Sequence, residues 1–228
     1  MDFLKKKNIN INDKKLLETA LTHSSYANEH DCDNYERLEY LGDAVLEVIT
    51  SEYFYLHTTH KEGTMTKLRA NYVCEKALAT YAKELGIDKH IRLGHGQIHN
   101  LNDTIIADVF EAVLAVIYLD QGFATSKEYI NSIIIPYIQK EIDFNADYKT
   151  KLQEVVQTDK KSLEYVVIKE YGEAHNKTFE VEVKIDNIIY GKGTGKSKKE
   201  AEQMAALDAL NRSARWIYVF KKYKSPRF

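Results

Sequence analysis

The sequence has 228 residues, of which 44% are apolar, so it can form one large domain or two smaller ones. Two cysteines, Cys32 and Cys74, provide no disulfide framework, and no apolar run approaches the ~18 residues that cross a membrane. We therefore expect a soluble, cytoplasmic protein without a membrane partner. The formal net charge of −2 is unevenly distributed, because residues 1–144 carry a net −7 and residues 145–228 a net +5. An acidic half joined to a basic half indicates two domains with different tasks.

Apolar residues in the first half recur three and four positions apart, which is the spacing of amphipathic helices. This pattern predicts helices over residues 13–25, 34–55, 66–86 and 104–122. Gly86 and Gly122 stand where the last two helices are expected to end. We expect no strand before about residue 160, so the first domain is predicted to be all-α.

The second half has a different pattern, with a helix before residue 158 and then three strand-like segments at 163–171, 177–185 and 187–195. The middle segment alternates clearly, with Phe179, Val181 and Val183 separated by glutamates. A final helix is predicted over 197–210, where Ser197 and Glu200 have the spacing of a capping box. The boundary between the two domains is predicted near residues 144–148.

Two predicted helices of the first domain carry paired carboxylates among apolar residues. Glu39 and Asp43 lie within ~40° of each other around a helix, and Asp108 and Glu111 lie within ~60°. A buried carboxylate without a partner costs several kcal/mol, so convergence of the two pairs requires a cation. An all-oxygen ligand set favours Mg²⁺ or Mn²⁺ over Zn²⁺. Spacing alone also fits two solvated surface pairs, so it indicates a metal site without establishing one.

The segment "ERLEYLGDAVLE" (36–47) closely resembles the signature helix of ribonuclease III, the endonuclease that cuts double-stranded RNA. "THSSYANE", "TKLRANYVCEKALA" and "ADVFEAVLAVIYLDQGF" resemble the same family in the same order, and the similarity covers about residues 10–210. The resemblance implies a catalytic domain over residues 1–145 that forms a homodimer. It also implies hydrolysis of phosphodiester bonds with Mg²⁺, for which Mn²⁺ can substitute. The products would carry 5′-phosphates and short 3′ overhangs.

The resemblance also assigns residues to the site. It implies that the metal is held by Glu39, Asp43, Asp108 and Glu111, with Asp43 and Glu111 as the critical catalytic pair. Glu36 would lie in the cleft, and Glu62 would support the site or the dimer interface.

The loop 92–104 departs from the family pattern, since it lacks the usual Glu-Glu and paired glycines and contains His95 and His99 instead. A zinc site at these histidines, or at those of "HTTH" (57–60), is the alternative interpretation. The much stronger interpretation is that all of them are ordinary histidines in surface loops.

The segment "GKGTGKSKKEAEQ" suggests a phosphate-binding loop, but the Walker pattern needs a glycine at position 190, where Tyr190 stands. We therefore expect no nucleotide cofactor. Lys196, Lys198 and Lys199 crowd a helix N-terminus, where the helix dipole disfavours cations by ~0.3–1 kcal/mol each. A bound phosphate backbone would reverse this cost, although a solvated run of charge is the alternative.

Residues 148–212 resemble a double-stranded RNA-binding domain of α-β-β-β-α order, so the whole chain is predicted to be an all-α domain followed by an α+β domain. By this resemblance, RNA is contacted by Thr150, Gln153 and Glu154 of the first helix, by His175 in a loop, and by Lys196, Lys198 and Lys199. The loop before His175 reads Glu173-Ala174, where the family often has Gly-Pro. Recognition is expected to follow the A-form shape of the duplex rather than its sequence.

Residues 213–228 form a basic, aromatic tail that lies outside both patterns, and the sequence does not decide its role. The resulting prediction is an endoribonuclease that processes precursors of ribosomal RNA, structured messenger RNAs and transfer RNAs. The alternative from another class is a protein that binds duplex RNA without cutting it. The presence of all four carboxylates favours the enzyme.

Overall fold

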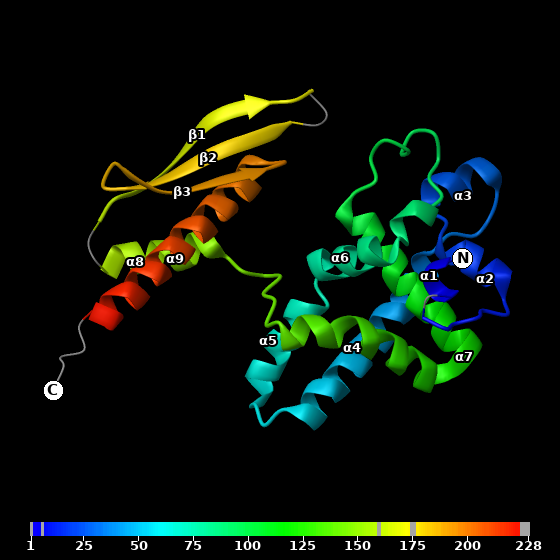
Figure 1. Ribbon diagram of the computed structural model, residues 1–228. Coiled ribbons are helices and arrows are strands. Elements are labelled where there is room, and N and C mark those ends of the chain that lie inside the picture. The colour runs from blue at the N-terminus through cyan, green and yellow to red at the C-terminus, as the bar shows by residue number, and fades with distance from the viewer. Residues whose placement is uncertain (1, 6, 159–160, 174–176, 224–228) are drawn as a thin grey trace. The chain divides into compact units, whose positions relative to one another are not determined.

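The computed structural model describes residues 2–5, 7–158, 161–173 and 177–223, with side chains from Phe3 to Arg212 within those ranges. The chain divides into two compact units, Met1–Asn145 and Ala146–Phe228, each with its own hydrophobic core (Figure 1). Within the described residues, no helix has the length and apolar character needed to span a membrane. The predicted class, an all-α domain followed by an α-β-β-β-α domain, is confirmed.

The first unit consists of helices joined by loops. These are α1 (Asp2–Lys5), α2 (Lys14–Ala20), α3 (Ser24–His30), α4 (Glu36–His57), α5 (Glu62–Tyr72), α6 (Glu75–Leu85), a 3₁₀ turn (Asp88–His90) and α7 (Asp103–Gln139). The first half of α7 runs through the centre of the core, because its residues from Ala112 to Ile117 are all completely buried. A helix that is apolar on every side must be surrounded in this way, and α4 and α6 pack against it.

The predicted end of a helix at Gly122 is confirmed locally, because Gly122 leaves the helical region with φ 81° and ψ 177°. The chain then resumes a helical path to Gln139, a continuation that was not predicted. Asp120, just before this break, accepts hydrogen bonds from the backbone N–H groups of Asn12 and Asp13. The break therefore also anchors the N-terminal segment.

The prediction of one helix over residues 13–25 was wrong, because α2 ends at Ala20 and a separate helix, α3, begins at Ser24. The prediction of one helix over residues 66–86 was wrong as well. The chain divides there into α5 and α6, since Val73 ends the first helix and Cys74 is extended with ψ 156°. The carbonyl of Cys74 accepts the N–H groups of Ala77 and Leu78 and so begins α6. Helical apolar spacing continues through the break because both helices bury a face in the same core.

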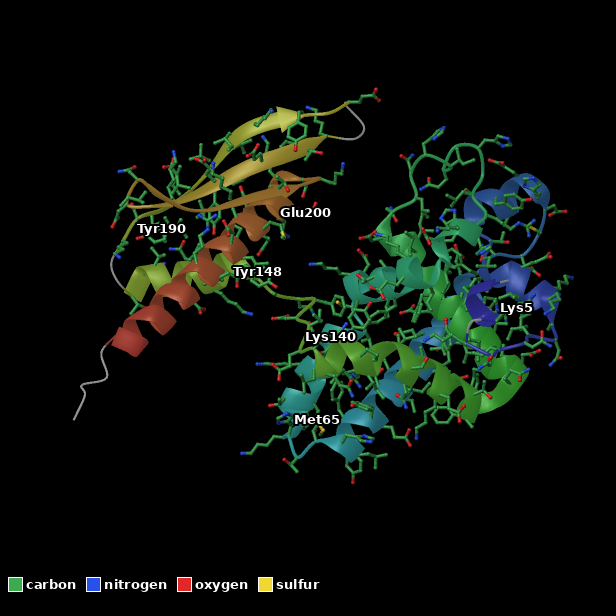
Figure 2. The ribbon with its side chains drawn as sticks, viewed as in Figure 1. Lys5, Met65, Lys140, Tyr148, Tyr190 and Glu200 are labelled. Carbon is green, nitrogen blue, oxygen red and sulfur yellow. The ribbon has the colours of Figure 1, made fainter. Side chains whose placement is uncertain are left out.

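The second unit has α8 (Tyr148–Thr158), β1 (Leu163–Tyr171), β2 (Thr178–Ile185), β3 (Ile188–Gly195) and α9 (Lys198–Tyr223). The strands form an antiparallel sheet in the order β1-β2-β3, with both helices on one face (Figure 1). Val181, Val183 and Ile185 of β2 point to this face and pack against the alanines of α9. Tyr148 and Tyr190, labelled in Figure 2, pack against the same core from α8 and β3.

The glycines of β3 allow the strand to lie directly on α9. A Cβ atom at Gly193 would lie 2.2 Å from the backbone nitrogen of Ala205, and one at Gly191 would lie 2.3 Å from the Ala205 carbonyl oxygen. The glycine repeat that suggested a phosphate-binding loop therefore serves close packing between strand and helix.

Candidate active site and nucleic-acid interface

Four carboxylates from α4 and α7 form what we call the acidic cluster: Glu39, Asp43, Asp108 and Glu111. Their two helices pack directly against each other (Figure 1). At the crossing, Gly42 of α4 contacts the backbone of Glu111, so no side chain separates the helices beside Asp43. The local sequence thus places one carboxylate pair opposite the other.

Glu111 experiences the strongest electrostatic effect in the acidic cluster. Burial and, to a smaller extent, the nearby charges of Asp43, Glu39 and Asp108 together raise its pKa to about 8. Both causes act against the charged form, because the carboxylate loses water and faces like charges. The site therefore strongly favours an added positive charge.

Glu39 and Asp108 are affected in the same direction. Burial raises the pKa of Glu39, and the charges of Asp108, Glu36 and Asp43 add to the effect. Burial also raises the pKa of Asp108, whereas a hydrogen bond from Tyr35 opposes that rise. Because each of these carboxylates contributes to the raised pKa of another across the two helices, we expect α4 and α7 to present them to a common region.

The donor set fits a hard divalent cation. The acidic cluster consists of carboxylate oxygens, which Mg²⁺ and Mn²⁺ prefer. Within the described part of the chain, no three His, Cys, Asp or Glu side chains are placed to enclose a metal ion by themselves. Mg²⁺ does not require such a cage, because it keeps several waters and takes only one or two protein carboxylates directly. The repulsion among the carboxylates shows where such an ion would be stabilised.

The two predicted supporting residues lie in different places. Glu36 is exposed in the first turn of α4, and its charge contributes to the raised pKa of Glu39, so it lies at the edge of the acidic cluster. Glu62 begins α5 and accepts a hydrogen bond from the Thr66 hydroxyl at 2.9 Å. It lines a pocket of about 340 Å³ beside the last turns of α4 rather than joining the acidic cluster of its own chain.

Two contacts of the acidic cluster were not predicted from the sequence. The Tyr35 hydroxyl donates to Asp108 Oδ2 at 3.1 Å. Glu47, one turn after Asp43, lies 3.8 Å from Arg69 of α5 and also influences the pKa of Glu111. The position of Tyr35 directly before the signature helix was the only available signal, since nothing local connects it with a residue 73 positions away.

His95 of the 92–104 loop has a structural partner. His95 Nδ1 lies 2.8 Å from Glu29 Oε2, and the His95 backbone N–H donates to Glu29 Oε1. Gly94 donates its N–H to the Ser25 hydroxyl at 3.0 Å. These contacts attach the loop to α3.

The predicted RNA-binding residues of α8 share one face, because Thr150, Gln153 and Glu154 are three and four positions apart. The Thr150 backbone N–H and hydroxyl both donate to Asp147, which caps the helix at 3.0 and 2.7 Å. Asp147 also accepts from the Gln203 side chain of α9 at 2.9 Å. These bonds fix the beginning of α8, with Thr150 and Glu154 exposed to solvent.

The three predicted lysines at the beginning of α9 are all exposed. The Ser197 hydroxyl accepts the Glu200 N–H at 3.1 Å, as the predicted capping box requires, but the Glu200 carboxylate accepts from the N–H of Lys196 instead of that of Ser197. Lys198 Nζ lies 5.8 Å above the Phe179 ring. Glu200 is labelled in Figure 2, in the first turn of α9. His175 lies outside the described residues, as do the side chains of the predicted tail 213–228.

An apolar stripe follows α4 on a solvent-exposed face. Tyr40, Ala44, Val48 and Tyr55 project within roughly 80° around the helix, and we call them the α4 stripe. Tyr40 is 83% exposed, Val48 57% and Tyr55 73%. The pocket near Glu62 lies at the Tyr55 end, where Met65 (labelled in Figure 2) also lines it. Exposed apolar residues that share one helix face, here interrupted by Ser51, are typical of an interaction site.

Comparisons with known proteins cover both units. Residues 13–138 match the Ribonuclease-III-like family, and residues 148–213 match the double-stranded RNA binding motif. Ribonuclease 3 of Onion yellows phytoplasma is 42% identical over 91% of this chain and 89% of its own length. Ribonuclease 3 of Streptococcus pneumoniae (strain CGSP14) is 46% identical over 90% of this chain and 92% of its own.

A solved structure resembles the first unit. It is the nuclease domain of ribonuclease III from Campylobacter jejuni, a protein described as structurally flexible in a region involved in dimer formation. It matches with a TM-score of 0.54 and 34% sequence identity, over 58% of this chain and 93% of the other.

Proposed function

Since the chain belongs to the ribonuclease III family of double-stranded-RNA endoribonucleases, we propose that the acidic cluster is its catalytic centre and that Mg²⁺ occupies it. The proposal is supported chiefly by the contact of Gly42 with the backbone of Glu111, which packs the helix segments that carry Asp43 and Glu111 against each other. The raised pKa of Glu111 agrees with it, because a buried carboxylate near other carboxylates needs a cation to remain charged. Mn²⁺ has similar ligand preferences and is expected to substitute.

The chain's own residues divide the work. Asp43 of α4 and Glu111 of α7, which influence each other electrostatically, would hold the ion between the two helices. Glu39 and Asp108 would add carboxylate oxygens, in part through the waters that Mg²⁺ keeps, and the exposed Glu36 would border the path by which substrate arrives. When bound, the metal activates water and neutralises charge on the scissile phosphate. The burial of Glu111 would limit competing solvent and so strengthen its interaction with the ion.

We further propose that the second unit binds the duplex and delivers it to the acidic cluster. Thr150, Gln153 and Glu154 of α8 would meet 2′-hydroxyl groups in one minor groove, and His175 would enter the next. Lys196, Lys198 and Lys199 would hold phosphates across the major groove, where the α9 N-terminus favours anions. The exposure of these three lysines to solvent supports their proposed role in binding phosphates.

The α4 stripe is proposed as the interface of a homodimer. A two-fold axis across the stripe near Val48 would bring Tyr40 of each copy toward the pocket at the other copy's Tyr55 end. Glu62 would then approach the partner's acidic cluster, which accounts for its distance from the cluster of its own chain. Two sites related by a two-fold axis match the two antiparallel strands of a duplex. From the resemblance to the family, the proposed products carry 5′-phosphates and short 3′ overhangs.

The proposed cellular role is processing of ribosomal RNA precursors, structured messenger RNAs and transfer RNAs in the cytoplasm. Shape-based recognition suits such varied substrates, because it reads the A-form helix rather than a sequence.

The direct test uses end-labelled duplex RNA and the purified full-length protein with and without Mg²⁺. We expect discrete fragments with 5′-phosphates only when the metal is present, and no cutting of either strand alone. A duplex that is retarded in a gel yet remains intact with Mg²⁺ and with Mn²⁺ would instead support a binding protein without nuclease activity.

A further inference from the structure

Tyr35 reaches the acidic cluster from outside the set of carboxylates. It stands immediately before α4 and is only 4% exposed. Its hydroxyl donates to Asp108 Oδ2 at 3.1 Å, across to α7. The hydrogen bond occupies one oxygen of that carboxylate and leaves Oδ1 for other partners.

Three further contacts hold Tyr35 in place. Its backbone N–H donates to the Thr22 carbonyl at 3.0 Å, and its ring lies 5.8 Å from the ring of His23. Its own carbonyl accepts the N–H of Glu39 at 2.9 Å. A single fixed residue therefore contacts the backbone that carries Glu39 and the side chain of Asp108, which belong to the two opposite halves of the acidic cluster.

A carboxylate that binds metal through one oxygen needs its plane fixed, because rotation would move that oxygen away from the ion. In metal sites this is commonly achieved by a hydrogen bond to the other oxygen. We propose that Tyr35 is a positioning residue that orients Asp108 so that Oδ1 faces the divalent cation. The inference rests on the proposed function, since it takes the acidic cluster to be the metal site.

The hydroxyl can be removed alone by Tyr35→Phe, and the chain offers a matched control. Tyr129 of α7 is also buried, at 3% exposure, and its hydroxyl has no hydrogen-bond partner within the described residues. Tyr129→Phe therefore removes the same atom from the same unit without touching the acidic cluster.

Binding of Mn²⁺ to the full-length protein without RNA, measured by calorimetry, gives a readout independent of cleavage. We expect Tyr35→Phe to weaken Mn²⁺ binding about 10-fold, and Tyr129→Phe to leave it unchanged. The Mg²⁺ concentration for half-maximal cutting of duplex RNA should rise by a similar factor in Tyr35→Phe, with the maximal rate approached again at high Mg²⁺. Circular dichroism establishes that the compared proteins are folded at the assay temperature.

A double-mutant cycle with Asp108→Asn separates positioning from general damage. Because Tyr35 acts through Asp108, its removal in the Asp108→Asn background should change Mn²⁺ binding less than 2-fold, measured by electron paramagnetic resonance at up to millimolar Mn²⁺. Full additivity in the cycle, or unchanged Mn²⁺ binding in Tyr35→Phe, would overturn the positioning role. Failure of the wild-type protein to bind Mn²⁺ and to cut duplex RNA would instead refute the proposed function.

Discussion

Gly42 of α4 lies against the carbonyl oxygen of Glu111 in α7, so closely that a Cβ atom at Gly42 would lie 1.9 Å from it. The closest approach of the two helices thus falls at the acidic cluster, next to Asp43 on one side and at Glu111 itself on the other. Only glycine fits this position, since a backbone carbonyl inside a buried helix cannot move aside as a flexible side chain can. The absence of a side chain at Gly42 therefore sets the separation of the two helices that carry the acidic cluster.

Gly42→Ala should force α4 away from α7. Overpacking of this kind costs about 1–3 kcal/mol or more, and it would also displace Asp43 relative to Glu111. We expect a lower melting temperature and a large loss of cutting. Gly63→Ala on α5 is the control, because its added Cβ would meet nothing within 4 Å. Equal melting temperatures and equal rates for the two variants would contradict the role of the Gly42 contact.

Glu111→Gln should abolish cutting while duplex binding persists, because the amide keeps the shape of the side chain but removes the charge that holds the cation. Loss of several kcal/mol of metal-assisted stabilisation corresponds to a rate decrease of roughly 10³-fold or more. The control is Glu128→Gln, because Glu128 is an exposed glutamate on the same helix. Single-turnover cutting and gel retardation of one labelled duplex measure both properties. Rapid cutting by Glu111→Gln would show that this carboxylate is not part of the site.

The pH dependence of stability without metal follows from the same residue. The carboxyl group of Glu111 has a pKa of about 8 in the folded protein against an ordinary 4.5. Between these values the folded protein retains a proton that the unfolded chain has lost, so the free energy of unfolding falls as pH rises from 4.5 to 8. With a chelator at pH 8.5, Glu111→Gln should be more stable than the wild type by on the order of 2 kcal/mol. Urea unfolding of both proteins between pH 4.5 and 8.5 measures the difference. The prediction would be disproved if the free energies of unfolding of the wild type and Glu111→Gln changed with pH in the same way.

Local patterns were sufficient for most of the fold. Alternation identified β2, because a half-exposed sheet imposes a period of two. The predicted segment 163–171 coincides with β1 (Leu163–Tyr171), although its apolar residues do not alternate. The break at Val73 and Cys74 could not be predicted, since apolar spacing records which face is buried and not where the chain changes direction. The turn at Asp186 and Asn187, both with positive φ, connects β2 and β3 and also carries a recognisable local signal.

The site was less accessible to sequence reasoning than the fold. Spacing placed Glu39 with Asp43 and Asp108 with Glu111, but only the resemblance connected the two pairs. The contacts of Gly42 with Glu111 and of Tyr35 with Asp108 join residues about 70 positions apart. Such contacts depend on how two helices cross, which one sequence without a structure does not specify.

Removal of a phosphate-binding lysine should reduce the salt dependence of duplex binding. Each lost phosphate contact lowers the magnitude of the slope of log K against log salt concentration by about 1. Lys199→Ala should therefore bind duplex RNA more weakly than the wild type and with a smaller salt dependence, for any RNA sequence. Lys184→Ala is the control, because Lys184 alternates with Val183 and Ile185 and so points away from both helices. Titrations of a duplex at several salt concentrations measure the slopes. An unchanged slope for Lys199→Ala would place the RNA elsewhere.

Introduction of a charge into the α4 stripe should separate the proposed dimer. Val48 and Ile98 are both 57% exposed, so neither substitution by aspartate disturbs the core. Val48→Asp would place two like charges near the two-fold axis, where a desolvated and unpaired charge costs several kcal/mol. We expect Val48→Asp to sediment as a monomer at concentrations at which the wild type and Ile98→Asp are dimers. Loss of the dimer should also uncouple cutting of the two strands, because each copy is proposed to supply the site for one strand. If Val48→Asp sediments with the wild type, the interface does not lie on this face of α4.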